Sequence, residues 1–134
     1  MRPINASHIV IRVMRVEEYD ELLGLWDKAE LPYRPRGRDS REHLARELEE
    51  GNGFFLVAEI RGELIGSVFA TSDSRKGWIN RLAVLPEYRR QGVGRMLVQD
   101  AERRLYRTGI EIIACLIEDW NAVSLQAFER MGYV

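Results

Sequence analysis

The segment from Leu82 to Arg95 constrains the fold more than any other part of the chain. It reads Leu-Ala-Val-Leu-Pro-Glu-Tyr-Arg-Arg-Gln-Gly-Val-Gly-Arg: an apolar run ended by proline, a basic turn with two glycines, and the start of a helix. The first turn of a helix carries unpaired backbone N–H groups and a partial positive charge. Gly92 and Gly94 lack Cβ atoms, so an anion can approach those amides closely. Arg89 and Arg90 add positive charge at the same point. The segment therefore predicts a phosphate-binding turn between a strand and a helix.

Two common phosphate-binding motifs do not match this turn. A dinucleotide-binding Rossmann turn needs a third glycine where this chain has Leu97. A P-loop needs Gly-Lys followed by Ser or Thr, which the chain lacks. A Gly-x-Gly turn by itself is a weak indication of function, because a plain helix start gives the same pattern.

Hydrophobic periodicity and turn residues predict the other elements. We expect strands at residues 9–14, 54–60, 63–71, 78–84 and 110–117, the last of the buried type. We expect helices at residues 17–30, 40–48, 92–107 and 121–130. Ser40 is the expected N-cap of the second helix and Gly51 its end, and an Arg61-Gly62 turn joins the second and third strands. The order β-α-α-β-β-β-α-β-α predicts an α/β (α+β) fold with a mixed sheet, in a single domain over residues 1–134.

Composition excludes several classes of protein. With 134 residues, 46% hydrophobic and 31% charged, the chain has the balance of one soluble globular domain. Its longest apolar run, residues 112–117, is far short of the roughly 20 residues that span a bilayer. The N-terminus has no apolar signal segment, so we expect a cytoplasmic protein that binds no membrane. Cys115 is the only cysteine and the two histidines lie far apart, so we expect neither a disulfide nor a bound metal.

The charges are nearly balanced but unevenly composed. The 20 cations are 18 Arg and 2 Lys against 21 carboxylates, a net charge of −1. Nucleic-acid binding draws its affinity from excess positive charge, so we expect no nucleic-acid partner. Arginine forks suit phosphate and carboxylate groups, and two clusters are candidates for such contacts, although a solvated surface explains them equally well. The clusters are Arg34, Arg36, Arg38 and Arg41, and Arg89, Arg90 and Arg95.

Two blocks of sequence resemble the GCN5-related N-acetyltransferase (GNAT) family. Residues 89–94, Arg-Arg-Gln-Gly-Val-Gly, match that family's acyl-CoA loop, R/Q-x-x-G-x-G/A, and residues 82–88 are similar to its lead-in strand. Residues 121–133 match N-x-x-(A/S)-x-x-x-(Y/F)-x-(K/R)-x-G-(F/Y). The resemblance covers about residues 54–134. It implies a GNAT-like acyl-CoA N-acyltransferase fold, with a mixed, mostly antiparallel central sheet flanked by helices.

The resemblance also implies acetyl-CoA as co-substrate and places it on particular residues. The pyrophosphate is expected on the loop that comprises Arg89, Arg90, Gln91, Gly92, Val93 and Gly94. The pantetheine arm is expected to pair like an extra strand with the backbone of Leu82, Ala83 and Val84. Asn121, assisted by Ser124, is expected to hydrogen-bond the pantetheine end, and Asn121 also suits a helix N-cap.

The expected chemistry needs an oxyanion donor, a base and a leaving group. The Val84 N–H is the candidate oxyanion donor, and Glu118 is the candidate base. Many GNAT proteins protonate the leaving thiolate with a tyrosine where this chain has Phe128, so that role is vacant or moved. Tyr88 and Tyr133 are alternatives, although packing suits both better. Further polar candidates near the expected site are Asp73, Asn80, Arg81 and Asp119.

We therefore expect an acetyl-CoA-dependent N-acetyltransferase that acetylates a primary amine by direct attack in a ternary complex. The acceptor is an amine on a small molecule or a protein, and the Arg-rich segment with Tyr33, Arg38 and Arg41 is expected to select a carboxylate-bearing one. The alternative, which Phe128 favours, is a non-catalytic acyl-CoA-binding or sensing module on the same fold.

The family's sheet continues beyond the Gly-Tyr pair with another hairpin, whereas this sequence ends at Val134. We expect the final strand or strands to be missing and residues 112–116 to form an exposed edge. Exposed edges pair with other chains, so we expect homodimerisation or aggregation.

Overall fold

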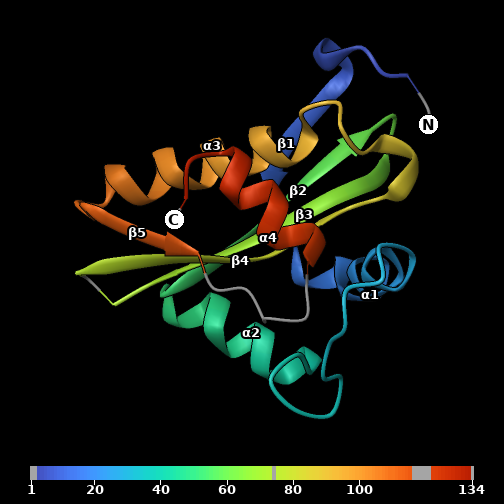
Figure 1. Ribbon diagram of the computed structural model, residues 1–134. Coiled ribbons are helices and arrows are strands. Elements are labelled where there is room, and N and C mark those ends of the chain that lie inside the picture. The colour runs from blue at the N-terminus through green and yellow to red at the C-terminus, as the bar shows by residue number, and fades with distance from the viewer. Residues whose placement is uncertain (1–2, 74, 116–121, 134) are drawn as a thin grey trace.

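A five-stranded sheet crosses the middle of the protein (Figure 1). The computed structural model describes residues 3–73, 75–115 and 122–133. The strands lie in the order β1–β2–β3–β4–β5. Strands β1 to β4 pair antiparallel, and β5 runs parallel to β4. The expected mixed, mostly antiparallel sheet is confirmed. Its strands are β1 (Ile9–Val13), β2 (Gly53–Ile60), β3 (Glu63–Ser72), β4 (Lys76–Val84) and β5 (Ile112–Cys115).

In the part of the chain that the structure describes, four α-helices cover the two faces of this sheet. Figure 1 shows α1 and α2 on one side of the strands and α3 and α4 on the other. Short 3-10 turns at Ala6–His8, Val16–Glu18 and Pro86–Tyr88 lead into longer elements. The element order agrees with the predicted one. The helices are α1 (Tyr19–Lys28), α2 (Arg41–Glu50), α3 (Val93–Arg107) and α4 (Ala122–Arg130).

Local signals set most element ends. The Ser40 side chain accepts a hydrogen bond from the His43 amide, and Gly51 ends α2 in the left-handed conformation, both as predicted. Helix α1 starts later than predicted, because residues 16–18 form a 3-10 turn. Arg61 and Gly62 both have positive φ, which is the type I′ geometry whose twist matches that of a β-hairpin.

Successive residues of β3 pack the two faces of the sheet. A Cβ on Gly66 would lie 3.0 Å from Leu97 on α3, so the missing side chain lets that helix sit close to the sheet. On the opposite face, the buried Trp26 of α1 donates its indole N–H to the Ser67 hydroxyl at 3.1 Å. The core is therefore continuous through β3.

The last strand differs from its prediction. Residues 110–117 were expected to form a buried strand. Residues 116 and 117 lie outside the described residues, β5 begins at Ile112 and is described as far as Cys115, and the Ile112 side chain is 58% exposed. Ile113 and Cys115 pack against the core, whereas the alternate residues Ile112 and Ala114 are exposed, so one face of the described strand is buried. Homodimerisation along this edge stays a prediction.

Two kinds of feature are absent from the described residues. In that part of the chain no helix is both long enough and apolar enough to cross a membrane. Nor do three or more His, Cys, Asp or Glu side chains gather there in a way that could hold a metal ion.

Candidate functional site

Strand β4 continues beyond its described pairing with β5. The described pairing ends at Ile79 with Cys115, whereas β4 runs on to Val84. Leu85 donates its amide to the Ile65 carbonyl on β3 at 2.9 Å. Because successive strand amides point to opposite sides, the Val84 N–H faces away from β3. It therefore points away from β3, toward the edge of β4 that pairs with β5 as far as Ile79 in the described residues.

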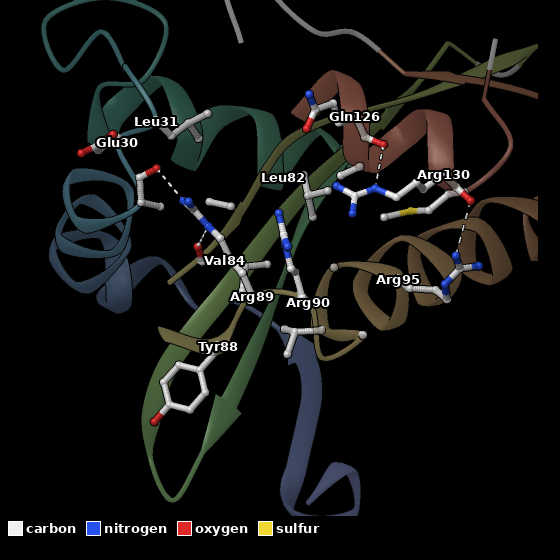
Figure 2. A pocket seen from close by; sticks show the side chains of 17 residues that line it. Glu30, Leu31, Leu82, Val84, Tyr88, Arg89, Arg90, Arg95, Gln126 and Arg130 are labelled. Carbon is white, nitrogen blue, oxygen red and sulfur yellow. Dashed lines mark hydrogen bonds between the residues drawn. The ribbon is translucent and has the colours of Figure 1, made fainter. Parts of the chain in front are cut away.

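A cleft of about 560 Å³ opens on this side (Figure 2). Its walls come from the end of α1, the end of β4, the turn before α3, the first turn of α3, and α4. The lining residues are Ala29, Glu30, Leu31, Leu82, Ala83, Val84, Tyr88, Arg89, Arg90, Gly92, Val93, Gly94, Arg95, Gln126, Ala127, Arg130 and Met131. Eight of the expected co-substrate residues are among them. Gln91 is not, and its side-chain oxygen accepts the Ile4 amide at 3.0 Å instead.

The start of α3 presents unpaired amides to this cleft. Gly92 is the N-cap residue with φ +87°, and no side chain caps the helix. The Met96 amide bonds the Gly92 carbonyl at 2.9 Å, so the preceding amides lie before the first intrahelical bond. The first turn carries no acidic residue, and a Cβ on Gly92 would touch nothing within 4 Å. An anion fits here both sterically and electrostatically.

The two arginines of the turn have different surroundings. Arg89 Nε donates to the Val84 carbonyl and Nη2 to the Ala29 carbonyl, both at 3.0 Å. It braces β4 against the end of α1, rather than serving only as a charge for an anion. Arg90 is exposed with φ +62°, and within the described residues its guanidinium has no hydrogen bond or ion pair. Arg90 is therefore the better candidate for a direct anion contact.

Sequence reasoning assigned Asn121 and Ser124 to the site but missed the cleft residues of α4, and it missed the end of α1 altogether; the missed residues are Gln126, Ala127, Arg130, Met131, Ala29, Glu30 and Leu31. Arg95 Nη2 donates to the Arg130 carbonyl at 3.4 Å, and Arg130 Nε donates to the Gln126 carbonyl at 3.2 Å. Figure 2 shows these side chains on the α3–α4 side of the cleft, opposite Glu30. The spacing from Gly92 could have placed Arg95 on the first helical turn. Glu30 lies too far away in sequence for any local signal.

The aromatic residues considered for proton donation are packed in the core, and of these Tyr88 also lines the cleft. Phe128 is 1% exposed and meets the Tyr133 ring edge-on at 5.3 Å. Tyr133 donates its hydroxyl to Glu102 at 3.1 Å, and burial together with the Glu102 carboxylate raises the pKa of Tyr133. Tyr88 is buried, and its ring turns away from Arg90 in Figure 2.

Several of the polar candidates lie outside the described residues. Glu118, Asp119 and Asn121 lie outside the described residues, and for Ser124 only its place in α4 is described. Asp73 accepts the amides of Arg75 and Lys76 at 2.9 and 2.8 Å. These hydrogen bonds lower the pKa of Asp73 and identify it as a turn residue.

The expected acceptor residues do not line the cleft. They lie on and beside the segment that follows the cleft residue Leu31. Tyr33 donates its hydroxyl to Asp27 at 2.8 Å, which raises the pKa of Tyr33. Arg38 Nε lies 3.7 Å from the Asp39 carboxylate. The Arg41 guanidinium lies 6.0 Å from the centre of the Tyr19 ring.

Comparison with known proteins gives a consistent picture. Residues 17–133 match the model of the acetyltransferase (GNAT) family. A PaiA N-acetyltransferase from Thermoplasma acidophilum, solved with coenzyme A, superposes with a TM-score of 0.79 at 23% identity, covering 92% of this chain and 88% of that one. An aminoglycoside acetyltransferase from an uncultured soil metagenomic sample, solved with trehalose, gives 0.77 at 19% identity, with 95% and 89% covered. A predicted acetyltransferase with acetyl-CoA from Clostridium acetobutylicum gives 0.76 at 12% identity, with 94% and 90% covered.

Proposed function

The chain belongs to the GNAT acetyltransferase family, and from that premise we propose that it transfers the acetyl group of acetyl-CoA to a primary amine. The observation that carries this proposal is the uncapped start of α3, which meets the end of β4 in one cleft. The Gly92–Arg95 amides suit a pyrophosphate, and the Leu82–Val84 backbone suits the amide groups of a pantetheine arm. Structures of the same fold contain CoA or acetyl-CoA, which supports acetyl-CoA as the co-substrate.

The proposed reaction is one nucleophilic substitution at the thioester carbon. The neutral amine attacks that carbon, the C–S bond breaks, and CoA leaves as a thiolate. The Val84 N–H, which faces the cleft, donates to the oxygen on which negative charge develops. Thiols have a pKa of about 8.5, so the thiolate leaves without the tyrosine that Phe128 replaces. Glu118 is the proposed base that takes the amine proton, directly or through water.

We propose further that the acceptor amine also carries a carboxylate. Three exposed arginines, Arg34, Arg36 and Arg38, stand on the loop before α2, and Arg41 begins that helix. They would repel a simple cationic amine, whereas an anionic group on the acceptor would be attracted. The Asp39 carboxylate offsets little of this charge toward solvent, because it is buried and paired with Arg81 at 2.6 Å.

A two-step experiment tests the proposed function. Calorimetric titration with acetyl-CoA and with CoA measures binding. Thiol release is then followed with glutamate, spermidine, kanamycin and a peptide with a free α-amine. Saturable binding together with amine-dependent thiol release is the expected result. Absence of binding would contradict the whole proposal.

A second candidate, the acyl-CoA-binding or sensing module, is favoured by Phe128. The buried ring donates no proton, and the hydroxyl of Tyr133 donates to the Glu102 carboxylate. Tight acetyl-CoA binding without thiol release above the amine-free rate would favour this candidate over the enzyme.

A further inference from the structure

Arg81 stands at an irregularity in β4. Ser67 pairs with Ala83, but Phe69 pairs with Asn80, so β4 holds one extra residue opposite β3. Arg81, in this bulge, has φ +56°. A long side chain in the left-handed region is unfavourable, and such strain persists only where the surroundings hold it. The surroundings of Arg81 must therefore hold it in this conformation.

The Arg81 guanidinium ties the bulge to the loop between α1 and α2. Its Nη1 donates to the Pro32 carbonyl at 2.7 Å, and its Nη2 donates to Asp39 Oδ2 at 2.6 Å. Asp39 is buried and Arg81 is partly buried, with side chains 6% and 12% exposed. The guanidinium also lies 5.3 Å from the centre of the Trp26 ring.

Asp39 in turn organises this loop. Its Oδ2 also accepts the Arg34 amide at 2.7 Å, and its backbone carbonyl accepts the Tyr19 hydroxyl. The loop's own bonds are short-range turns, such as the Gly37 amide to the Arg34 carbonyl. The loop is thus fastened to the rest of the protein at its two ends, near Pro32 and at Asp39, and Arg81 bonds to both.

We propose that the Arg81–Asp39 pair is a latch that holds residues 32–39 where the acceptor amine is admitted to the cleft. The proposal rests on the proposed function, because it takes this loop as the acceptor side. The loop leaves the cleft at Leu31, and the bulge lies just before the β4 residues that line the cleft. Arg81 and Asp39 are accordingly positioning residues: they touch neither reactant but fix the loop relative to β4.

The test uses three latch variants and one control in the full-length chain. Arg81→Gly removes the side chain but suits the positive φ, so the bulge is retained. Asp39→Asn removes the charge at nearly the same size, and Arg81→Lys keeps the charge without the fork. Glu59→Gln is the matched control, because it weakens another ion pair, to Arg12 at 3.2 Å, away from the loop.

Two readouts separate a latch from a general loss of stability. In Arg81→Gly and Asp39→Asn, we expect KM for the most active of the four amines to rise at least tenfold, while acetyl-CoA affinity stays within twofold. Arg81→Lys recovers part of the loss. Hydrogen exchange of amides 33–40 rises at least tenfold in the two disabled variants and is unchanged in Glu59→Gln.

Each opposite outcome overturns the proposal at a different point. Unchanged exchange in residues 33–40 would show that the pair does not hold the loop. Faster exchange with unchanged acceptor KM would show that the loop does not position the acceptor. A wild-type protein that acetylates none of the four amines contradicts the proposed function, and the exchange data still decide whether the pair holds the loop.

Discussion

Arg89 connects β4 to the end of α1 by donating hydrogen bonds to the carbonyl oxygens of Val84 and Ala29, both at 3.0 Å. The Val84 carbonyl lies on the same side of the strand as the Val84 N–H, toward the cleft. Arg89 therefore shapes one wall of the cleft, while Arg90 remains an exposed cation beside it. The two consecutive arginines of the motif therefore differ in role: Arg89 has a structural role, and Arg90 has the proposed binding role.

Alanine variants of these two arginines should separate the structural role from the binding role. Arg89→Ala leaves two carbonyls without their donors, so we expect a loss of about 1–3 kcal/mol in the free energy of unfolding and weaker acetyl-CoA binding. Arg90→Ala should weaken acetyl-CoA binding about tenfold, with stability changed by no more than about 0.5 kcal/mol. Urea titration and calorimetry measure both. Equal stability losses in the two variants would contradict this division.

Stability should depend on pH through Glu18. The Arg12 guanidinium donates to both Glu18 oxygens at 2.8 and 2.6 Å and lowers the pKa of Glu18 to about 2. Because the folded-state pKa lies below the unfolded value of about 4.3, this stabilisation is complete above the unfolded value. It is lost as pH falls toward 2 and amounts to about 2–3 kcal/mol.

Glu18→Gln should abolish this part of the pH dependence. Urea titrations at pH 7 and pH 3 are compared for the wild type and the variant. We expect the variant to be less stable than the wild type at pH 7, with a smaller difference at pH 3. A stability difference that is the same at both pH values would contradict the role assigned to the Arg12–Glu18 pair.

The Arg61-Gly62 turn offers a stabilising substitution. Arg61 has φ +51°, and asparagine adopts this conformation more readily than arginine. Arg61→Asn should raise the free energy of unfolding by about 0.5–1 kcal/mol, whereas Arg61→Val should lower it. Urea midpoints give both values. A more stable valine variant would show that the turn does not keep this conformation in solution.

The acceptor proposal predicts a charge-dependent change in KM. Arg38→Ala and Arg41→Ala should each raise KM for glutamate about threefold to tenfold, because each removes a partner for its carboxylates. KM for spermidine, which has no carboxylate, should stay unchanged or fall. Steady-state thiol release measures both. An unchanged KM for glutamate would remove the support for a carboxylate-bearing acceptor.

Features encoded by neighbouring residues could be predicted from the sequence. The Ser40 cap, the Arg61-Gly62 turn and the amphipathic α3 depend on spacings within a few residues, and the structure has all three. The two motifs led to the family and the fold for a similar reason. A glycine turn between a strand and a helix fixes the local backbone whatever surrounds it.

Features that depend on distant partners could not be predicted. Arg89 has an acceptor 60 residues away at Ala29, and Arg81 has one 42 residues away at Asp39. The apolar composition of β5 could not show that only one of its faces is covered. In each case the sequence supplies the side chain, and tertiary packing decides what it contacts.

A pair of substitutions at Gly92 tests the pyrophosphate site on this turn directly. Asparagine and aspartate are nearly equal in size, both tolerate the left-handed region better than other side chains, and the position has open space. They differ in one negative charge at the mouth of the α3 amides. In calorimetric titrations, we expect the Gly92→Asp variant to bind acetyl-CoA at least tenfold more weakly than the Gly92→Asn variant. Equal affinities for the two variants would contradict a pyrophosphate site on this turn.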